Sequence, residues 1–293
     1  MSQLVPKRVI ASTDGAELAY WVHRANHSSD RFALLIHGGA SNHTRWSEFA
    51  ENTSLSNNWN LIVPDMRGNS ESMTRANLDI TTWLNDLLDV LAAEQAQSAL
   101  IIGHSLGAQF AVQFAYKYPQ KANGLVLIDP TLQQQLQGRS LQVRRCRWLV
   151  KGLVAMILLL NHLGLRRRNF PIRDLHELDK ETRVAIRDAD SFDEIAKRYS
   201  AITPVLKTMP VANYLRQALV MVSPLPALEE LTLPVLAVLS GGSTLGNASL
   251  NQQAVDRFAN SETSILNANH WPLTETPAEV RQAIDVWVSK KFP

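Results

Sequence analysis

The sequence predicts an α/β protein with a mostly parallel central sheet, helices on both faces, and a helical cap inserted between the sixth and seventh strands. Short apolar runs alternate with segments of helical periodicity along most of the 293 residues. Between residues 131 and 226 this alternation stops, and the chain becomes basic and helical with no clear strand. We therefore expect a core formed by residues 1–130 and 227–293, and a cap formed by residues 131–226.

Eight segments have the pattern of strands. Residues 5–12 and 16–23, joined by the turn residues Thr13, Asp14 and Gly15, predict an N-terminal hairpin. Six further apolar runs predict buried strands: FALLIHGG (32–39), WNLIVPD (59–65), ALIIG (99–103), GLVLIDP (124–130), PVLAVLSGG (234–242) and TSILNANH (263–270).

Three helices of the core have recognisable ends. Residues 79–95 carry apolar side chains at helical spacing, and Asp79 is suited to the N-cap. A second helix is expected from Ala108 to Tyr118, ended by Pro119. The last begins with Pro277, because proline is favoured in a first helical turn.

Composition excludes several classes of protein. The chain is 45% hydrophobic and 19% charged with a net charge of +2, which is typical of a globular protein. No nucleic-acid-binding motif accompanies the excess of 16 Lys and Arg over 8 Asp and Glu between residues 131 and 225, so we expect no nucleic-acid partner. Cys146 is the single cysteine, so no internal disulfide can form. The first residues lack the apolar core of a secretory signal, and we expect a cytoplasmic location.

One stretch of the cap, LVKGLVAMILLLNHLGL (149–165), is strongly apolar. Its uninterrupted core, residues 153–160, is shorter than the roughly 20 residues that span a bilayer. Arginines flank it on both sides, at positions 144, 145, 147 and 166–168. The pattern favours a helix buried in the protein. It also leaves open a helix that lies against lipid, giving peripheral membrane contact, or one that lines an apolar substrate entrance.

The stretch GHSLG places Ser105 between Gly103 and Gly107, where a strand gives way to a helix. Ligands of an open parallel sheet bind at the carboxyl ends of its strands, where this turn lies. A tight strand-to-helix turn needs small neighbours, and it lifts the hydroxyl clear of the sheet beside the amides of the helix N-terminus. The pattern therefore favours Ser105 as a nucleophile over a serine that is incidental to a glycine-rich turn.

A serine hydroxyl needs a base to remove its proton. His270 follows the last predicted strand and precedes the final helix, which places it at the same edge of the sheet. We interpret it as the base. His104 adjoins Ser105 in sequence, but successive residues in a tight turn point apart, and we expect His104 to pack beneath the turn.

GHSLG (103–107), HGG (37–39), DMRGNS (65–70) and NHWPLTETP (269–277) together resemble the α/β-hydrolase family, over nearly the whole chain except residues 131–226. The resemblance implies that residues 131–226 are the variable helical cap. It also implies that the amides of Gly39 and Leu106 hold an oxyanion. Ser70 stands where the family pattern D-x-R-G-x-G-x-S has its second glycine. Asp65 and Arg67 are interpreted as structural residues that tie loops together.

The family resemblance implies a catalytic triad of serine, histidine and a carboxylic acid, and the position of the acid departs from the usual family pattern. Most relatives carry it after the seventh strand, where this sequence has Thr244, and no carboxylate follows until Asp256 in a predicted helix. Asp129, directly after the sixth strand, is the best candidate, because some family members use that position and an imidazole without an anion loses orientation. The alternative is an incomplete triad.

The resulting hypothesis is a serine hydrolase that cleaves carboxylic esters, with apolar acyl or lipid-like substrates, through an acyl-enzyme intermediate. Neither a metal nor an organic cofactor is expected, since no metal-binding spacing is present. Two other classes stay open. One is a cofactor-free dioxygenase on the same fold, in which a base deprotonates an organic substrate. The other is a member that binds a ligand or partner without catalysis.

Overall fold

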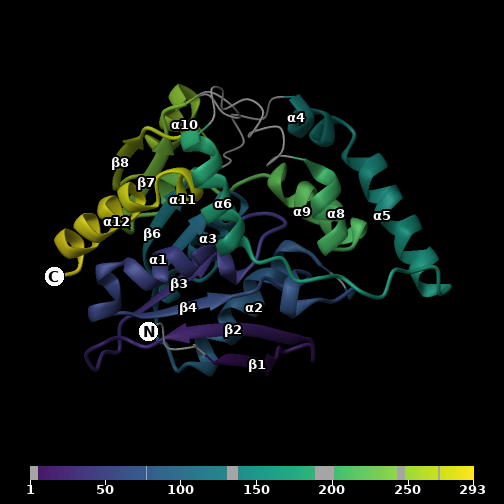
Figure 1. The fold of residues 1–293 in the computed structure, drawn as a ribbon, viewed down its shortest axis with the longest axis horizontal. Coiled ribbons are helices and arrows are strands. Elements are labelled where there is room, and N and C mark those ends of the chain that lie inside the picture. Colours follow the sequence, from purple (N-terminus) through teal and green to yellow (C-terminus); the bar gives the residue numbers. More distant parts are fainter. Residues whose placement is uncertain (1–5, 77, 131–137, 189–200, 243–247, 270) are drawn as a thin grey trace.

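A computed structural model describes residues 6–76, 78–130, 138–188, 201–242, 248–269 and 271–293 (Figure 1). Eight strands form one sheet in the order β1-β2-β4-β3-β5-β6-β7-β8. Their bounds are β1 Lys7–Ala11, β2 Glu17–His23, β3 Phe32–Ile36, β4 Asn60–Pro64, β5 Ala99–His104, β6 Ala122–Ile128, β7 Val235–Ser240 and β8 Ser261–Leu266.

The pairing of the strands confirms the predicted fold class. β2 pairs antiparallel with β1 and β4, and the remaining neighbours from β4 to β8 are parallel. Several strands end earlier than the sequence predicts: β3 ends at Ile36, β7 at Ser240 and β8 at Leu266. The described residues that follow these strands, 37–39, 241–242 and 267–269, lie outside the strands and form loops at the carboxyl edge.

Helices cover both faces of the sheet. Those outside the predicted cap are α1 Ser47–Asn52, α2 Ile80–Ala93, α3 Leu106–Lys117, α10 Ala248–Val255, α11 Pro272–Glu275 and α12 Pro277–Lys291. Short 3₁₀ turns lie at His43–Trp46, Ser54–Asn57, Ser70–Ser72, Pro119–Lys121 and Leu228–Glu230. The predicted N-cap of α2 is confirmed, because the Asp79 carboxylate accepts the amide of Thr82 at 2.8 Å.

The alternation of side chains along the strands divides the core into two layers. Leu34 and Ile36 point to the face where α2 and α3 pack, with Trp83 and Phe110. The other face is covered by α1 and α12 and contains Leu35, Ala33 and Trp287, among others. Successive residues of β3 therefore serve opposite layers, as a strand covered on both sides requires.

Between β6 and β7 the described residues form five helices and no strand. These are α4 Gly138–Arg145, α5 Arg147–His162, α6 Leu175–Asp188, α8 Ile202–Thr208 and α9 Val211–Met221. α9 attaches to loops at the carboxyl edge, because Asn213 donates to the carbonyl oxygens of Gly68 at 3.1 Å and of Thr74 at 2.8 Å. The helices thus lie where the sequence predicts a cap, and the division of the chain into residues 1–130, 131–226 and 227–293 stays a prediction.

The expectation that the apolar stretch 149–165 is a buried helix is wrong. This stretch forms most of α5, and Val154 is its one buried residue. α5 packs on α9 and lies at the outer margin of the molecule (Figure 1). Large apolar side chains on the side of α5 away from α9 are exposed to solvent. In the described part of the chain, no helix is long and apolar enough to cross a membrane.

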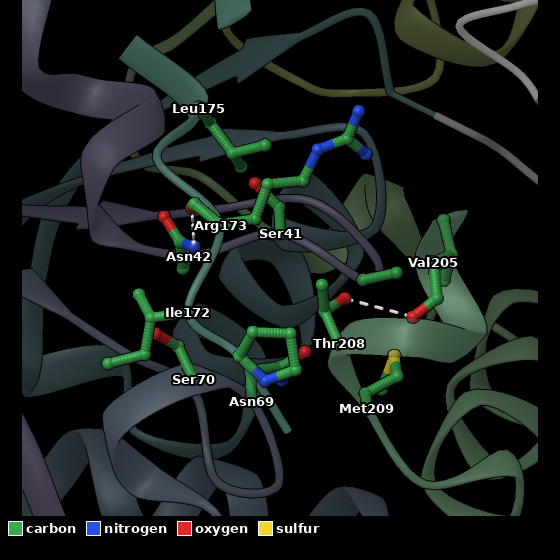
Figure 2. Close-up of a pocket in the computed structure, with 12 residues that line it drawn as sticks. Ser41, Asn42, Asn69, Ser70, Ile172, Arg173, Leu175, Val205, Thr208 and Met209 are labelled. Carbon is green, nitrogen blue, oxygen red and sulfur yellow. Dashed lines mark hydrogen bonds between the residues drawn. The ribbon is translucent and has the colours of Figure 1, made fainter. Parts of the chain in front are cut away.

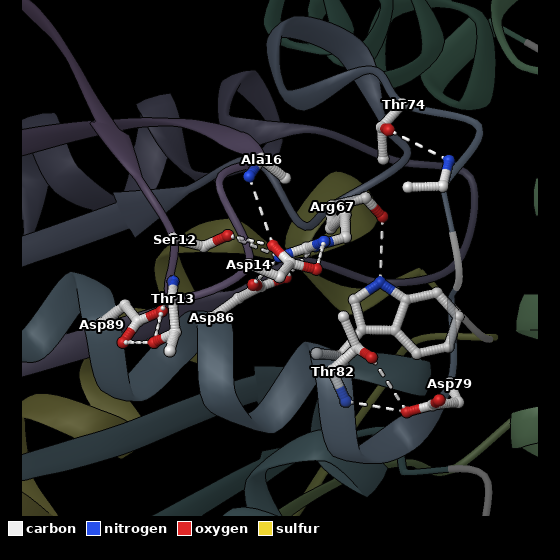
Figure 3. A network of polar contacts seen from close by, with 12 residues as sticks. Ser12, Thr13, Asp14, Ala16, Arg67, Thr74, Asp79, Thr82, Asp86 and Asp89 are labelled. Atoms are coloured by element: carbon white, nitrogen blue, oxygen red, sulfur yellow. Dashed lines mark hydrogen bonds and ion pairs between the residues drawn. The ribbon is translucent and has the colours of Figure 1, made fainter.

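Arg67 ties the N-terminal hairpin to α2 (Figure 3). Its guanidinium donates to Asp86 at 2.7 Å, to Asp14 at 2.6 Å and to the hydroxyl of Ser12 at 2.7 Å. Burial alone would lower the pKa of Arg67, but its bonds to the two carboxylates raise it above its ordinary value. The buried indole of Trp83 donates to the Arg67 carbonyl at 2.9 Å. As predicted, Arg67 is a structural residue.

Candidate active site

Ser105 lies on a strained turn between β5 and α3. Its backbone has φ 52° and ψ −115°, a conformation that L-residues seldom adopt. Its neighbours His104 and Leu106 are buried, whereas Ser105 is partly exposed. The turn thus presents the serine at the N-terminus of α3, as the GHSLG pattern predicts.

The two glycines beside Ser105 permit close backbone contact. A Cβ atom at Gly107 would lie 2.3 Å from the carbonyl oxygen of Ile36 in β3, and one at Gly103 would lie 2.4 Å from the carbonyl oxygen of Gly107. These obstacles are backbone atoms of the sheet and helix, so they cannot rotate away as a side chain could. Both glycines are therefore required by packing.

Replacing Gly107 with alanine is expected to lower the free energy of unfolding by about 3 kcal/mol or more, because the new methyl group forces α3 and β3 apart. Gly152, in α5, is the matched control: a Cβ there meets nothing within 4 Å. Gly152→Ala should raise stability by up to about 1 kcal/mol, since alanine favours a helix. Urea unfolding followed by circular dichroism measures both. Equal stability of the two variants would contradict the packing assignment.

The loop after β3 brings Gly39 against the Ser105 turn. A Cβ at Gly39 would lie 3.5 Å from Cδ2 of Leu106, and one at Gly38 would lie 3.5 Å from Cβ of Ser105. The next residue, Ala40, has φ 51°, and its amide donates to Oε1 of Gln217 in α9 at 2.8 Å. The structure therefore places Gly39 and Leu106 side by side next to Ser105, and a helix of the predicted cap holds the loop in place.

His37 fixes this loop from beneath. Its Nε2 accepts the amide of Met66 at 3.0 Å, which assigns the proton to Nδ1, 2.8 Å from the carbonyl oxygen of Gly38. Burial is the main cause that lowers the pKa of His37 below its ordinary value. The native ring is therefore neutral where an unfolded histidine already takes up a proton.

Acid is consequently expected to destabilise the fold through His37. Below pH about 6.5 the unfolded state binds one more proton than the native state, so stability falls by about 1.4 kcal/mol per pH unit as the pH decreases. Denaturant unfolding at pH 7.5 and 5.5 measures this slope. His37→Asn should reduce it, and His27→Asn, at an exposed position, should leave it unchanged. An unchanged slope in His37→Asn would refute the assignment.

Asp129 directly follows β6, just as Ser105 directly follows the neighbouring strand β5. His104 pairs in register with Ile128, and the Ser105 amide donates to the Ile128 carbonyl at 2.9 Å, so residues 105 and 129 leave adjacent strand ends. Asp129 is buried, has φ 42°, and accepts the amide of Ser240 on its Oδ1 at 3.1 Å. Its carboxylate therefore lies between the ends of β6 and β7.

His270 lies outside the described residues, and so do Thr244 and the rest of residues 243–247. The loop that leads to His270 is described. The amide of Gly242 donates to the carbonyl of Ala268 at 2.8 Å, so this loop runs beside the end of β7, the strand next to Asp129. The loop thus lies at the same edge of the sheet as Ser105.

Glu275, a residue for which the sequence predicts no role, anchors this loop. Its two carboxylate oxygens accept the amides of Asn269 and Trp271, each at 2.9 Å. One carboxylate thereby holds the backbone on both sides of position 270. The only indication of this role in the sequence is that Glu275 belongs to the stretch NHWPLTETP. Its contact with Asn269 depends on the short helix α11, which turns the chain back toward residue 269.

Asp65 also ties loops at this edge, as predicted. It accepts the amide of His43 at 2.7 Å and that of Glu71 at 3.0 Å, and lies 3.0 Å from Nδ1 of His43. Burial would raise the pKa of Asp65, but the hydrogen bonds and charge of His43 lower it below its ordinary value. The carboxylate is therefore held charged as a loop anchor.

A buried ion pair joins the predicted cap to the core. Arg45 donates to Asp179 of α6 and, at 2.7 Å, to the hydroxyl of Thr274 in α11. The same hydroxyl donates to Asp179 at 3.0 Å. Three segments far apart in sequence thus meet beside the loop that leads to position 270. This cluster cannot be predicted from the sequence, because no sequence motif links Arg45, Asp179 and Thr274 to one another.

A small cavity of about 20 Å³, enough for one water molecule, lies between this edge and the predicted cap (Figure 2). Ala40, Ser41 and Ser70 line it from the core. Pro171, Ile172, Arg173, Leu175, Val205, Thr208 and Met209 line it from the cap side. Ser70 has φ 40°, which explains why the family pattern has glycine there. The hydroxyls of Ser41 and Ser70 are buried without a hydrogen-bond partner in the described part of the chain.

The arrangement of sheet, serine turn and glycine loop defines a class of protein. A family model described as the alpha/beta hydrolase family matches residues 33–283, and the chain belongs to that family. In the described part of the chain, no group of three His, Cys, Asp or Glu side chains is placed to hold a metal ion.

Individual proteins resemble this chain over only part of its length or at low sequence identity. The chain is 35% identical over 97 residues to an uncharacterized protein of Mycobacterium tuberculosis, covering 33% of this chain and 28% of that protein. It is 29% identical over 98 residues to a 2-hydroxymuconate semialdehyde hydrolase of a Pseudomonas species, covering 32% and 35% of the two chains. A thermophilic esterase from Thermogutta terrifontis shares the fold, with a TM-score of 0.69 and 20% identity over 98% of this chain and 100% of that one.

Proposed function

We propose that this protein is a serine hydrolase that cleaves carboxylic esters through an acyl-enzyme intermediate. The observation that carries the proposal is Ser105. It is partly exposed on a strained turn at the N-terminus of α3, while its sequence neighbours are buried. A buried structural serine needs neither that backbone nor that exposure. Membership of the alpha/beta hydrolase family supports the same chemistry.

In this mechanism Ser105 attacks the acyl carbonyl of the ester while His270 removes its proton. The amides of Gly39 and Leu106 stabilise the negative charge on the tetrahedral oxygen, each contributing roughly 3 kcal/mol in the transition state. His270 then protonates the departing alkoxide. A water molecule then attacks the acyl carbonyl while His270 removes its proton. The bond between the acyl carbon and the Ser105 oxygen breaks as His270 returns the proton to that oxygen, and the carboxylic acid is released.

Asp129 is proposed to orient His270 and stabilise its imidazolium form. Its carboxylate is buried between the ends of β6 and β7, where the loop leading to position 270 also runs. The Ser240 amide donates to one of its oxygens at 3.1 Å and so helps to hold the carboxylate in place.

We propose substrates with apolar acyl groups. The support is the apolar character of α5, which packs on α9, the helix whose Gln217 contacts the loop that contains Gly39. A second candidate function is hydrolysis of a semialdehyde substrate, and the name of the Pseudomonas relative supports it.

A fluorophosphonate probe and a chain-length series of nitrophenyl esters test the proposal. Covalent labelling at Ser105, with faster turnover of longer acyl chains within the soluble range, is the expected result. No labelling of the folded protein would favour a non-catalytic binding role. Consumption of oxygen with a hydroxyquinolone-type substrate, without ester cleavage, would favour a cofactor-free dioxygenase, whose acid can also follow the sixth strand.

A further inference from the structure

α5 has apolar side chains on two opposite sides. Val150, Val154, Ile157 and Leu158 are buried or half-buried on the side toward α9. The opposite side, the outer face of α5, is exposed and consists of Trp148, Leu149, Leu153, Met156, Leu159, Leu160 and Leu163 at the helix end. Trp148 is 69% exposed, Leu159 60% and Leu163 67%. A contiguous exposed face of this kind is rare on a protein surface that meets only water.

Positive charge borders this face at both ends. Arg144, Arg145 and Arg147 precede it, Arg166, Arg167 and Arg168 follow it, and all six are exposed. Between residues 130 and 173 the chain has no Asp or Glu. The same range contains nine basic residues, namely Arg139, Arg144, Arg145, Arg147, Lys151, Arg166, Arg167, Arg168 and Arg173. The surface around α5 therefore lacks its own counter-charge in this segment.

Arg75, from the loop between β4 and α2, joins the second group of arginines. Its guanidinium donates to the carbonyl oxygen of Arg167 and stacks 5.5 Å from the ring of Phe170. Arg167 stacks on the same ring at 4.9 Å. The core thus adds a cation to the end of α5 where three arginines already lie.

We infer that the outer face of α5 docks on an anionic lipid surface, with the helix lying in the plane of the bilayer interface. Apolar side chains would enter the acyl boundary, and the arginines at both ends would reach the lipid phosphates. The 16 residues of α5 extend about 24 Å, which is too short to span and suited to lying flat.

Charge argues against a second copy of the chain as the occupant. Two α5 helices packed face to face bring arginines opposite arginines, whether they run parallel or antiparallel, because both ends are basic. An acidic surface satisfies both ends at once. The inference concerns binding alone, and it does not depend on the chemistry at Ser105.

Vesicle co-sedimentation of the full chain carrying Ser105→Ala tests the inference without hydrolysing the lipid. Binding to vesicles of phosphatidylcholine with phosphatidylglycerol is expected to exceed binding to phosphatidylcholine alone and to weaken as salt is raised. The double variant Trp148→Glu/Leu159→Glu should lose at least about tenfold in affinity. The matched control is Ile265→Glu/Val286→Glu, at apolar positions 64% and 61% exposed outside the cap, and it should bind like the parent.

Quenching by brominated lipid locates the contact. Trp148 should contribute a quenched signal in the parent that disappears in Trp148→Phe. Equal binding to both kinds of vesicle, or full binding by the α5 double variant, would overturn the inference. So would a dimer in analytical ultracentrifugation that the same double variant dissociates. Unchanged thermal unfolding of the variants verifies that they fold, and because the parent already carries Ser105→Ala, these outcomes are separate from any result on catalysis.

Discussion

Ser105→Ala is expected to lower kcat/KM for nitrophenyl esters by about 10⁴-fold or more. The hydroxyl is the one group in the proposed mechanism that forms a bond to the substrate, so its loss removes the acyl-enzyme route altogether. The residual rate would come from the oxyanion amides and from substrate binding. Alanine has the same Cβ as serine at φ 52°, so the strain of the turn and the thermal unfolding temperature should stay close to those of the parent.

Ser70→Ala is the matched control for this variant. Ser70 is also a serine in the left-handed region, at φ 40°, and its hydroxyl is buried at the same edge of the sheet. In the proposed mechanism it forms no bond to the substrate, so kcat should change by no more than a few fold. Initial rates and fluorophosphonate labelling of both variants measure the difference. If Ser105→Ala hydrolysed esters as fast as Ser70→Ala, Ser105 would not be the nucleophile.

The sheet could be predicted from sequence because its signals are local. The strands β3, β5, β6 and β7 are buried on both faces, which leaves uninterrupted apolar runs in the chain. The serine turn could be predicted for a similar reason. Gly103 and Gly107 lie two residues on either side of Ser105, and their close contacts leave a short pattern in the sequence.

The environment of α5 could not be predicted in this way. Apolar periodicity identifies a helix and its apolar sides, but it cannot tell a neighbouring helix from solvent. α5 has one side of each kind, since Val154 is buried on the side toward α9 while Met156 is exposed. The favoured prediction of a buried helix is wrong because α9 and α4, the helices that contact α5 in the described part of the chain, leave its outer side exposed.

The long-range contacts that position the loops of the candidate site could not be predicted from the sequence either. Gln217 reaches Ala40 across 177 positions of sequence, and Arg45 reaches Asp179 across 134. Glutamine and arginine are residues of the protein surface more often than of its interior, and only the tertiary fold places Gln217 and Arg45 where they anchor loops. The loops of the candidate site were therefore predicted by motif, whereas the side chains that position those loops were not.

The choice of Asp129 as the acid leads to the second large effect. Asp129→Asn is expected to lower kcat by about 10³- to 10⁴-fold, because a neutral amide cannot stabilise the imidazolium that forms on His270 and orients the wrong tautomer. The asparagine oxygen can still accept the Ser240 amide, now at 3.1 Å from Oδ1, so the ends of β6 and β7 should stay in place. Thermal unfolding of the variant checks that they do.

Asp256→Asn separates this assignment from the usual family pattern. Asp256 is the first carboxylate after β7 in the sequence, and it lies exposed just beyond α10, where it accepts a bond from Gln252 at 2.7 Å. If the triad acid came from the β7 side of the site, Asp256→Asn would reduce kcat and Asp129→Asn would not. The proposal requires the opposite, since only Asp129 is buried beside the strand end that adjoins Ser105. A full set of rates for both variants from pH 5 to 9 decides between them, because loss of the triad acid alters the pH dependence of kcat, whereas loss of a structural carboxylate changes stability alone.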